Sequence, residues 1–202
     1  MDVTTNLCTS LGECAAISAG FPFRGAIDAL AKGGIAVIQM RNVDDARGVE
    51  WAKLTKVELP TKRKLDLLTP GDVILTTRGR RNFALALTDI PYPAVCSPHF
   101  FVIRVRQPKV LLPEFLAWQI NQKAAQEHIQ QSATGSYILN LTRAAVESVP
   151  ITIPPMSTQA AAVALASAAH REVATLQALI DNQRSLIEVV ATKILNSERP
   201  SA

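Results

Sequence analysis

The chain has 202 residues, of which 48% are hydrophobic and 19% are charged, and this balance excludes a disordered chain. Its net charge of +4 is compatible with a nucleic-acid partner but does not establish one. Three cysteines fit neither a zinc site nor a disulfide framework, and no apolar run is long enough to cross a membrane. With no signal segment at its start, we expect a soluble protein of the reducing cytoplasm.

Residues 1–155 predict a domain of short strands and a few helices. Strands are expected at residues 35–40, 72–77 and 100–105, where β-branched and aromatic residues lie next to turn residues. A helix is expected from Pro113, since proline suits a first helical turn, to about residue 131. Because strands and helices do not alternate regularly, the prediction is an α+β fold. We expect a mixed, twisted β-sheet with flanking helices and not a doubly wound sheet.

Residues 156–202 predict one long helix. Ser157 suits an N-cap, and neither proline nor glycine occurs again before Pro200. Apolar residues then recur every seven positions, which is typical of a coiled coil. The predicted seam consists of Ala162, Ala166, Ala169, Val173, Leu176, Ile180, Gln183, Ile187, Val190 and Ile194. Such a helix cannot bury its own seam, so we expect it to pack on a second chain; the alternative is that it folds back on residues 1–155.

The excess positive charge lies in the first part of the chain and is clustered. Arg78, Arg80 and Arg81 lie within four positions directly after a predicted strand, and Asn82 comes next. Closely spaced like charges need solvent or a polyanion to compensate them. Arginine pairs with phosphates and with guanine, and asparagine pairs with adenine. The segment is therefore a candidate DNA-reading loop, and the alternative is a solvated surface loop.

Five further residues, in three places along the chain, are candidates for DNA contact. Lys62, Arg63 and Lys64 form a second basic cluster that would face phosphates, and Arg41 follows the strand predicted at residues 35–40. Ser136 lies in a Gly-Ser turn after the predicted helix. This turn either presents backbone N–H groups to a phosphate or simply ends the helix.

The sequence contains none of the common catalytic motifs. There is no Gly-x-x-x-x-Gly-Lys loop for a triphosphate and no His-Glu-x-x-His zinc motif. A nuclease would need clustered carboxylates for a divalent metal. The carboxylates nearest to the arginines are Asp66, interpreted as solvated, and Asp72, interpreted as a strand-entry residue. We therefore expect no catalytic residue, no bound metal and no cofactor.

Several segments, taken in order, form a pattern known from one family. They are GFPFRG (20–25), LTPGDVIL (68–75), SPHFFVIR (97–104), LPEFLAWQ (112–119) and VPITIPP (149–155), followed by Gln159 and the heptad helix. No single segment is diagnostic, but the ordered set resembles the specificity subunit of type I restriction–modification systems. The resemblance covers nearly the whole chain.

The resemblance implies a sequence-specific DNA-recognition subunit without catalysis of its own. In this family a target recognition domain, here residues 1–155, reads half of a split site in double-stranded DNA. A long helix, here residues 156–202, acts as a spacer and docks methyltransferase subunits. A family member usually carries two such domains, so we expect a homodimer through the helix that reads two inverted half-sites. The alternative is a protein–protein adaptor that binds methyltransferase subunits through the helix, with only incidental DNA contact.

Overall fold

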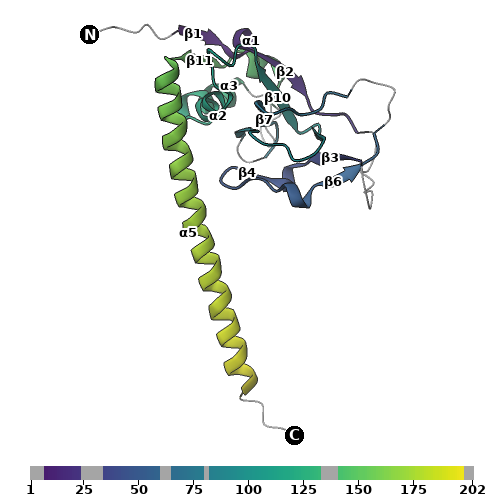
Figure 1. The fold of residues 1–202 in the computed structure, drawn as a ribbon, viewed down its shortest axis with the longest axis vertical. Helices are drawn as coiled ribbons and strands as arrows, with labels where there is room; N and C mark the ends of the chain where they lie inside the picture. The colour runs from purple at the N-terminus through teal and green to yellow at the C-terminus, as the bar shows by residue number, and fades with distance from the viewer. Residues whose placement is uncertain (1–6, 24–33, 60–64, 80–81, 133–140, 198–202) are drawn as a thin grey trace, which may run out of the picture. The chain divides into compact units, whose positions relative to one another are not determined.

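Figure 1 shows the computed structural model, which describes residues 7–23, 34–59, 65–79, 82–132 and 141–197. The predicted α+β class is confirmed, because several small sheets and flanking helices precede one long C-terminal helix. The chain divides into two units, Met1–Ala164 and Leu165–Ala202. Within the described ranges, no helix combines the length and the hydropathy needed to cross a bilayer.

The first unit is built around a four-stranded antiparallel sheet. Its strands, in spatial order, are Ala15–Ala19 (β2), Phe100–Val105 (β10), Asp72–Thr76 (β7) and Ala84–Ala86 (β8). Every residue of β7 is buried, which explains the apolar run Val73–Leu75 at its centre. Successive side chains face opposite sides, so Val73 and Leu75 belong to one hydrophobic cluster and Ile74 to another.

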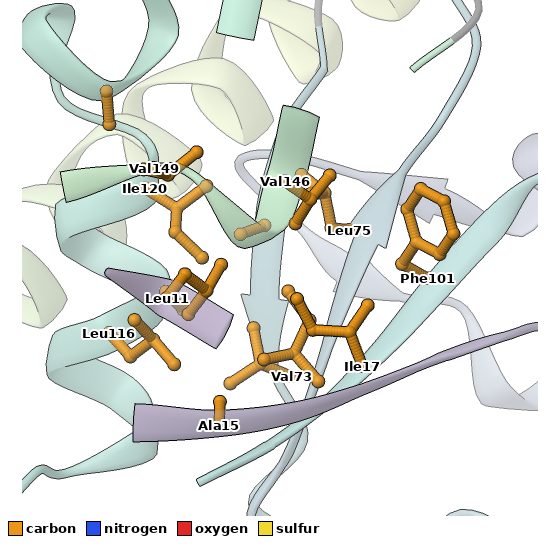
Figure 2. Packing of buried hydrophobic residues seen from close by; sticks show 14 of the residues in the cluster. Leu11, Ala15, Ile17, Val73, Leu75, Phe101, Leu116, Ile120, Val146 and Val149 are labelled. Carbon is orange, nitrogen blue, oxygen red and sulfur yellow. The ribbon is translucent and has the colours of Figure 1, made fainter. Parts of the chain in front are cut away.

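Helices cover one face of this sheet. They are Leu11–Cys14 (α1), Pro113–Ile120 (α2), Lys123–Ser132 (α3) and Arg143–Glu147 (α4). Helix residues such as Leu116 and Val146 gather there with Val73 and Phe101 of the sheet (Figure 2). Burying each large apolar side chain stabilises the fold by about 1.5–3 kcal/mol. This cluster therefore holds the sheet and the helices together as one core.

A second sheet has three strands and is mixed. Ile35–Ile38 (β3) lies between Thr55–Val57 (β6), which is antiparallel to it, and Ala94–Cys96 (β9), which is parallel. The strand expected at residues 35–40 ends at Ile38, because Met40–Asn42 (η1) form a turn of 3₁₀ helix. Three smaller pieces complete the unit. They are the pair Leu7–Ser10 (β1) and Pro150–Ile153 (β11), the pair Val43–Asp44 (β4) and Gly48–Val49 (β5), and the 3₁₀ turn Trp51–Lys53 (η2).

The single helix expected from Pro113 to about residue 131 is divided into α2 and α3. Side-chain amides take over carbonyl groups at the division. Gln122 Nε2 donates to Trp118 O (2.7 Å), and Gln126 Nε2 donates to Ile120 O (2.8 Å). Because these carbonyls are satisfied by side chains, the backbone can leave the helix there without an unpaired buried group.

The long helix runs from Met156 to Ser197 (α5), close to the bounds expected from the sequence. Its first turns belong to the first unit, where Ala162 and Val163 pack against the cluster of Figure 2. The start of α5 is therefore part of the folded core of that unit.

Candidate nucleic-acid interface

Several strand ends of the first unit meet at one edge. Strand register brings the carboxyl ends of β2 and β7 beside the amino end of β10, and the carboxyl end of β3 beside that of β9. Backbone hydrogen bonds join the segments that follow: Thr77 N donates to His99 O (2.9 Å), and Ser97 N donates to Ile38 O (2.9 Å). Side chains just beyond these strands therefore share one edge, which we call the strand-end edge.

Arg78 extends from this edge. It is exposed and follows the buried residues of β7 and Thr77. Gly79 has a positive φ of 120°, a backbone conformation that side-chain-bearing residues rarely adopt. A rigid strand thus ends in a sharp bend with a guanidinium group in solvent, which is a suitable position for contact with a polyanion.

Asn82, predicted to contact a base, is buried. Its Nδ2 donates to Thr76 O (2.7 Å), and Phe83 N donates to the Thr76 hydroxyl (2.9 Å). These bonds join the two ends of the segment between β7 and β8. We call the segment between β7 and β8, which contains Arg78, Arg80 and Arg81, the arginine loop. In this structure Asn82 stabilises the base of the arginine loop and does not present its amide to solvent.

Arg41 lies in η1, directly after β3, and is exposed. Its Nη2 donates to the Thr55 hydroxyl (3.0 Å) at the start of β6. A single neutral partner leaves most of the five N–H groups of a guanidinium available. Arg41 is therefore a second exposed cation at the strand-end edge.

The junction that follows β2, β3 and β9 is closely packed. A Cβ atom at Gly20 would lie 2.0 Å from Ser97 O, so only glycine fits there. Two buried side-chain atoms of the described residues have no hydrogen-bond partner, Gln39 Nε2 and Ser97 Oγ. Both residues directly follow the paired ends of β3 and β9.

Arg104 has a different environment from Arg78 and Arg41. Its Nε and Nη2 donate to the two carboxylate oxygens of buried Asp72 (2.8 and 2.9 Å), and a further nitrogen pairs with Asp66. Hydrogen bonding to Asp72 raises the pKa of the Arg104 guanidinium. Asp72 begins β7 as expected, whereas Asp66, interpreted as solvated, is exposed but ion-paired. The cross-strand register sets this pair, and no local sequence pattern predicts it.

Several predicted contact residues lie outside the described residues. They are Lys62, Arg63, Lys64, Arg80, Arg81 and Ser136. Of the predicted DNA-contact set, the structure describes Arg41, Arg78 and Asn82, and it brings the two arginines to the same edge.

No metal centre is found in the described part of the chain, because no three His, Cys, Asp or Glu side chains gather there. Burial raises the pKa of the Cys96 thiol, so this residue stays protonated and packs in the core. What the described edge offers chemically is exposed positive charge on a rigid frame.

The predicted seam of α5 carries large apolar side chains in solvent. The side chains of Val173, Leu176, Ile180, Ile187, Val190 and Ile194 are between 43% and 61% exposed. Ala162, also predicted for the seam, packs against the core of the first unit. A row of exposed β-branched residues and leucines on one helix face is typical of a surface that binds another helix.

This fold is shared by solved structures of type I restriction–modification proteins. The S subunit of a type I restriction–modification system from M. genitalium matches with a TM-score of 0.63 and 14% identity, covering 98% of this chain and 48% of that one. The HsdS subunit from Thermoanaerobacter tengcongensis matches with a TM-score of 0.58 and 17% identity, covering 87% of this chain and 40% of that one. A structure described as the basis of complex assembly and conformational transition of the type I restriction–modification system matches with a TM-score of 0.62 and 16% identity. The match covers 97% of this chain and 46% of that one. The fold is thus that of specificity subunits, and the chain spans about half the length of these proteins or less.

A sequence model described as "Type I restriction modification DNA specificity domain" matches residues 9–182. The chain therefore belongs to the family of type I restriction–modification DNA specificity domains, as its segments indicated. Among curated protein sequences, none matches it.

Proposed function

We propose that this protein is a sequence-specific recognition subunit for double-stranded DNA in a type I restriction–modification system. Residues 1–155 act as a target recognition domain that reads one half-site, and residues 156–202 act as a spacer and dimerisation helix. The chain has no catalytic activity of its own and works in the cytoplasm with methyltransferase subunits that bring S-adenosylmethionine. Family membership over residues 9–182 supports the role in DNA recognition.

The observation that carries the proposal is the position of Arg78. It lies exposed at the end of a fully buried strand, on a loop whose base is closed by Asn82, and on the same edge as Arg41. Phosphate contacts fix a protein on DNA, and base-edge contacts select the sequence. A loop with arginines at 78, 80 and 81 can do both, since one guanidinium pairs with guanine O6 and N7 while others hold phosphates.

The width of the apolar face of α5 supports two kinds of helical partner. Besides the seam, Leu165, Leu179 and Leu186 lie one position before seam residues and are 74%, 62% and 62% exposed. A two-stranded coiled coil buries two residues per heptad, whereas a helix in a bundle buries three. We infer that α5 packs against a second copy of itself and against a helix of a methyltransferase subunit.

The proposal is tested by the salt dependence of duplex binding. Arg78, Arg80 and Arg81 are replaced together by alanine, and affinity for a pool of random duplexes is measured over a range of salt concentrations. Each lost phosphate contact flattens the slope of log K against log salt by about 0.9 units, so a loss of about 1–3 units is expected. The matched control removes three exposed cations elsewhere, Lys109, Lys123 and Arg143. Equal slopes for wild type and the loop variant would contradict the assignment of this loop.

The exposed apolar seam of α5 also favours a second function, that of a protein–protein adaptor. In that case the helix binds methyltransferase subunits and DNA contact is incidental. Co-purification with a methyltransferase subunit, together with no duplex binding by the assembled complex, would support the adaptor. Duplex binding that depends on the arginine loop would exclude it.

A further inference from the structure

The first turn of α5 contains a fully buried glutamine, Gln159. Its Nε2 donates to Val110 O (2.8 Å) and to Pro154 O (2.8 Å), and its Oε1 accepts from Leu112 N (2.9 Å). Both donor hydrogens and the acceptor oxygen are therefore used. A buried carboxamide with three short bonds to three backbone groups has a fixed orientation.

These bonds join the start of α5 to the residues just before it and to a segment that is distant in sequence. Val110 and Leu112 lie in the connection between β10 and α2, Pro154 follows β11, and Gln159 belongs to α5. All of them are in the first unit. Gln159 therefore ties the start of the long helix directly to the frame that carries the central sheet.

The strand that leads into α5 is fixed in the same way. Gln119 of α2 donates through Nε2 to Thr152 O (2.9 Å) and accepts from Thr152 N (2.8 Å). The other edge of β11 pairs with β1. With strand β11 held on both edges, the remaining freedom at the helix start is its rotation and sliding on the core.

Apolar contacts alone do not remove that freedom. Ala162 and Val163 pack against the core next to Gln159, but hydrophobic burial has no preferred direction. Hydrogen bonds require donor and acceptor to align within a few tenths of an ångström and a limited angle. The carboxamide thus sets the rotation of the first turn, while the apolar residues supply attraction.

We propose that Gln159 is a positioning residue that fixes the start of α5 on the recognition domain and thereby the spacing between half-sites that the protein accepts. The inference rests on the proposed function, in which α5 is the spacer. One added base pair between half-sites shifts the second one by about 3.4 Å and rotates it by about 34°. Only a spacer held rigidly at its start can distinguish such steps.

The experiment compares wild type with Gln159→Met, which keeps the length of the side chain and removes its hydrogen bonds. Duplexes selected by the wild-type protein from a random pool are rebuilt as a single half-site and as paired half-sites with spacers varied by one base pair. Gln130→Met is the matched control, because Gln130 is exposed on α3. Amide exchange of Leu112, whose N–H is donated to Gln159, is measured without DNA.

We expect Gln159→Met to bind the single half-site as wild type does, while the preference for the best spacer over its neighbours falls by about tenfold or more. Exchange of the Leu112 amide should accelerate in the same variant. Gln130→Met should change neither the spacer preference nor the Leu112 exchange rate. A purely structural role would lower affinity for every duplex equally.

Unchanged spacer preference in a folded Gln159→Met protein would overturn the inference. If that variant does not fold, Gln159→Glu, which keeps the acceptor for Leu112 and loses both donors, is judged by the same comparison. A wild-type protein that protects the Leu112 amide but binds duplexes without any spacer preference would overturn the spacing role and the half-site function together. Retained half-site binding separates this inference from the proposed function itself.

Discussion

Two arginines, one within the four-stranded sheet and one just beyond it, have opposite surroundings. Arg104 lies within β10, and strand register puts it directly across from Asp72 in β7. Arg78 lies beyond the end of β7, where no neighbouring strand residue faces it in the register. Residue type and spacing predicted the charge of both, but not the cross-strand partner of Arg104, since pairing depends on contacts 32 positions apart. The bond of Asn82 to Thr76 is local in sequence, but the burial of Asn82 depends on the surrounding fold and could not be predicted from the sequence pattern.

Replacing Arg104 by methionine should destabilise the protein. The change leaves the buried Asp72 carboxylate with only its bonds from the Thr69 backbone and hydroxyl. Losing one partner of a fully buried pair costs about 3–5 kcal/mol, and the side chain of Arg104 is 34% exposed, so we expect about 2–3 kcal/mol after solvent screening. Urea unfolding measures the loss.

Arg106→Met is the control for this change. Arg106 is exposed, and its contact with Gly12 O is long at 3.5 Å, so its replacement should alter stability by no more than about 0.5 kcal/mol. If both variants unfold at the same urea concentration as wild type, the pair with Asp72 does not stabilise the fold. Arg104 would then be available for another role.

At the scale of elements, the sequence predicted those whose pattern is local. β7 has the apolar centre Val73–Leu75, β10 begins with the apolar run Phe100–Ile103, and α5 carries a heptad repeat without a helix breaker. Their positions therefore follow from neighbouring residues. Strands β1 and β11 could not be found in this way. They are short, partly exposed and paired across almost the whole first unit, from Leu7 to Ile153. The division between α2 and α3 likewise depends on side-chain amides, not on a proline or glycine.

The heptad face of α5 leads to a prediction about association. Ile180 lies at the centre of the seam and is 43% exposed. If a second copy covers this face, Ile180→Asp buries an unpaired carboxylate in each helix. We expect the dissociation constant of the dimer to rise by at least about a hundredfold, because a penalty of about 2.7 kcal/mol corresponds to that factor. Analytical sedimentation at a protein concentration of tens of micromolar separates monomer from dimer, because a dimer with a dissociation constant of about 1 μM is largely associated at that concentration.

Ala178→Asp is the matched control for Ile180→Asp. Ala178 is exposed on the helix side away from the seam, two positions before Ile180. The Ala178→Asp substitution should leave the sedimentation coefficient unchanged. Circular dichroism should show the same helix content in both variants. A monomeric wild-type protein would mean that the stripe binds another subunit instead of a second copy.

At the scale of the whole molecule, the proposed dimer would raise the affinity for DNA above that of one small protein–DNA interface. On the proposed function, a single recognition domain with a few arginine contacts is expected to bind its half-site weakly and with strong salt dependence. Joining two such domains makes the second binding event intramolecular, at an effective concentration of about the millimolar range. In that proposal, affinity for a paired site depends on the helix as much as on the arginine loop.

This coupling predicts a difference between single and paired sites. Wild type should bind a duplex with two inverted half-sites about 10²–10⁴ times more tightly than a duplex with one. Ile180→Asp should bind both duplexes with nearly the affinity of wild type for one half-site, because each domain still folds but acts alone. Fluorescence anisotropy at fixed salt gives the four dissociation constants, and salt must be fixed because phosphate contacts make every value depend on it. Equal affinity of wild type for one and two half-sites would show that the recognition domains are not linked through α5, even if each of them reads DNA.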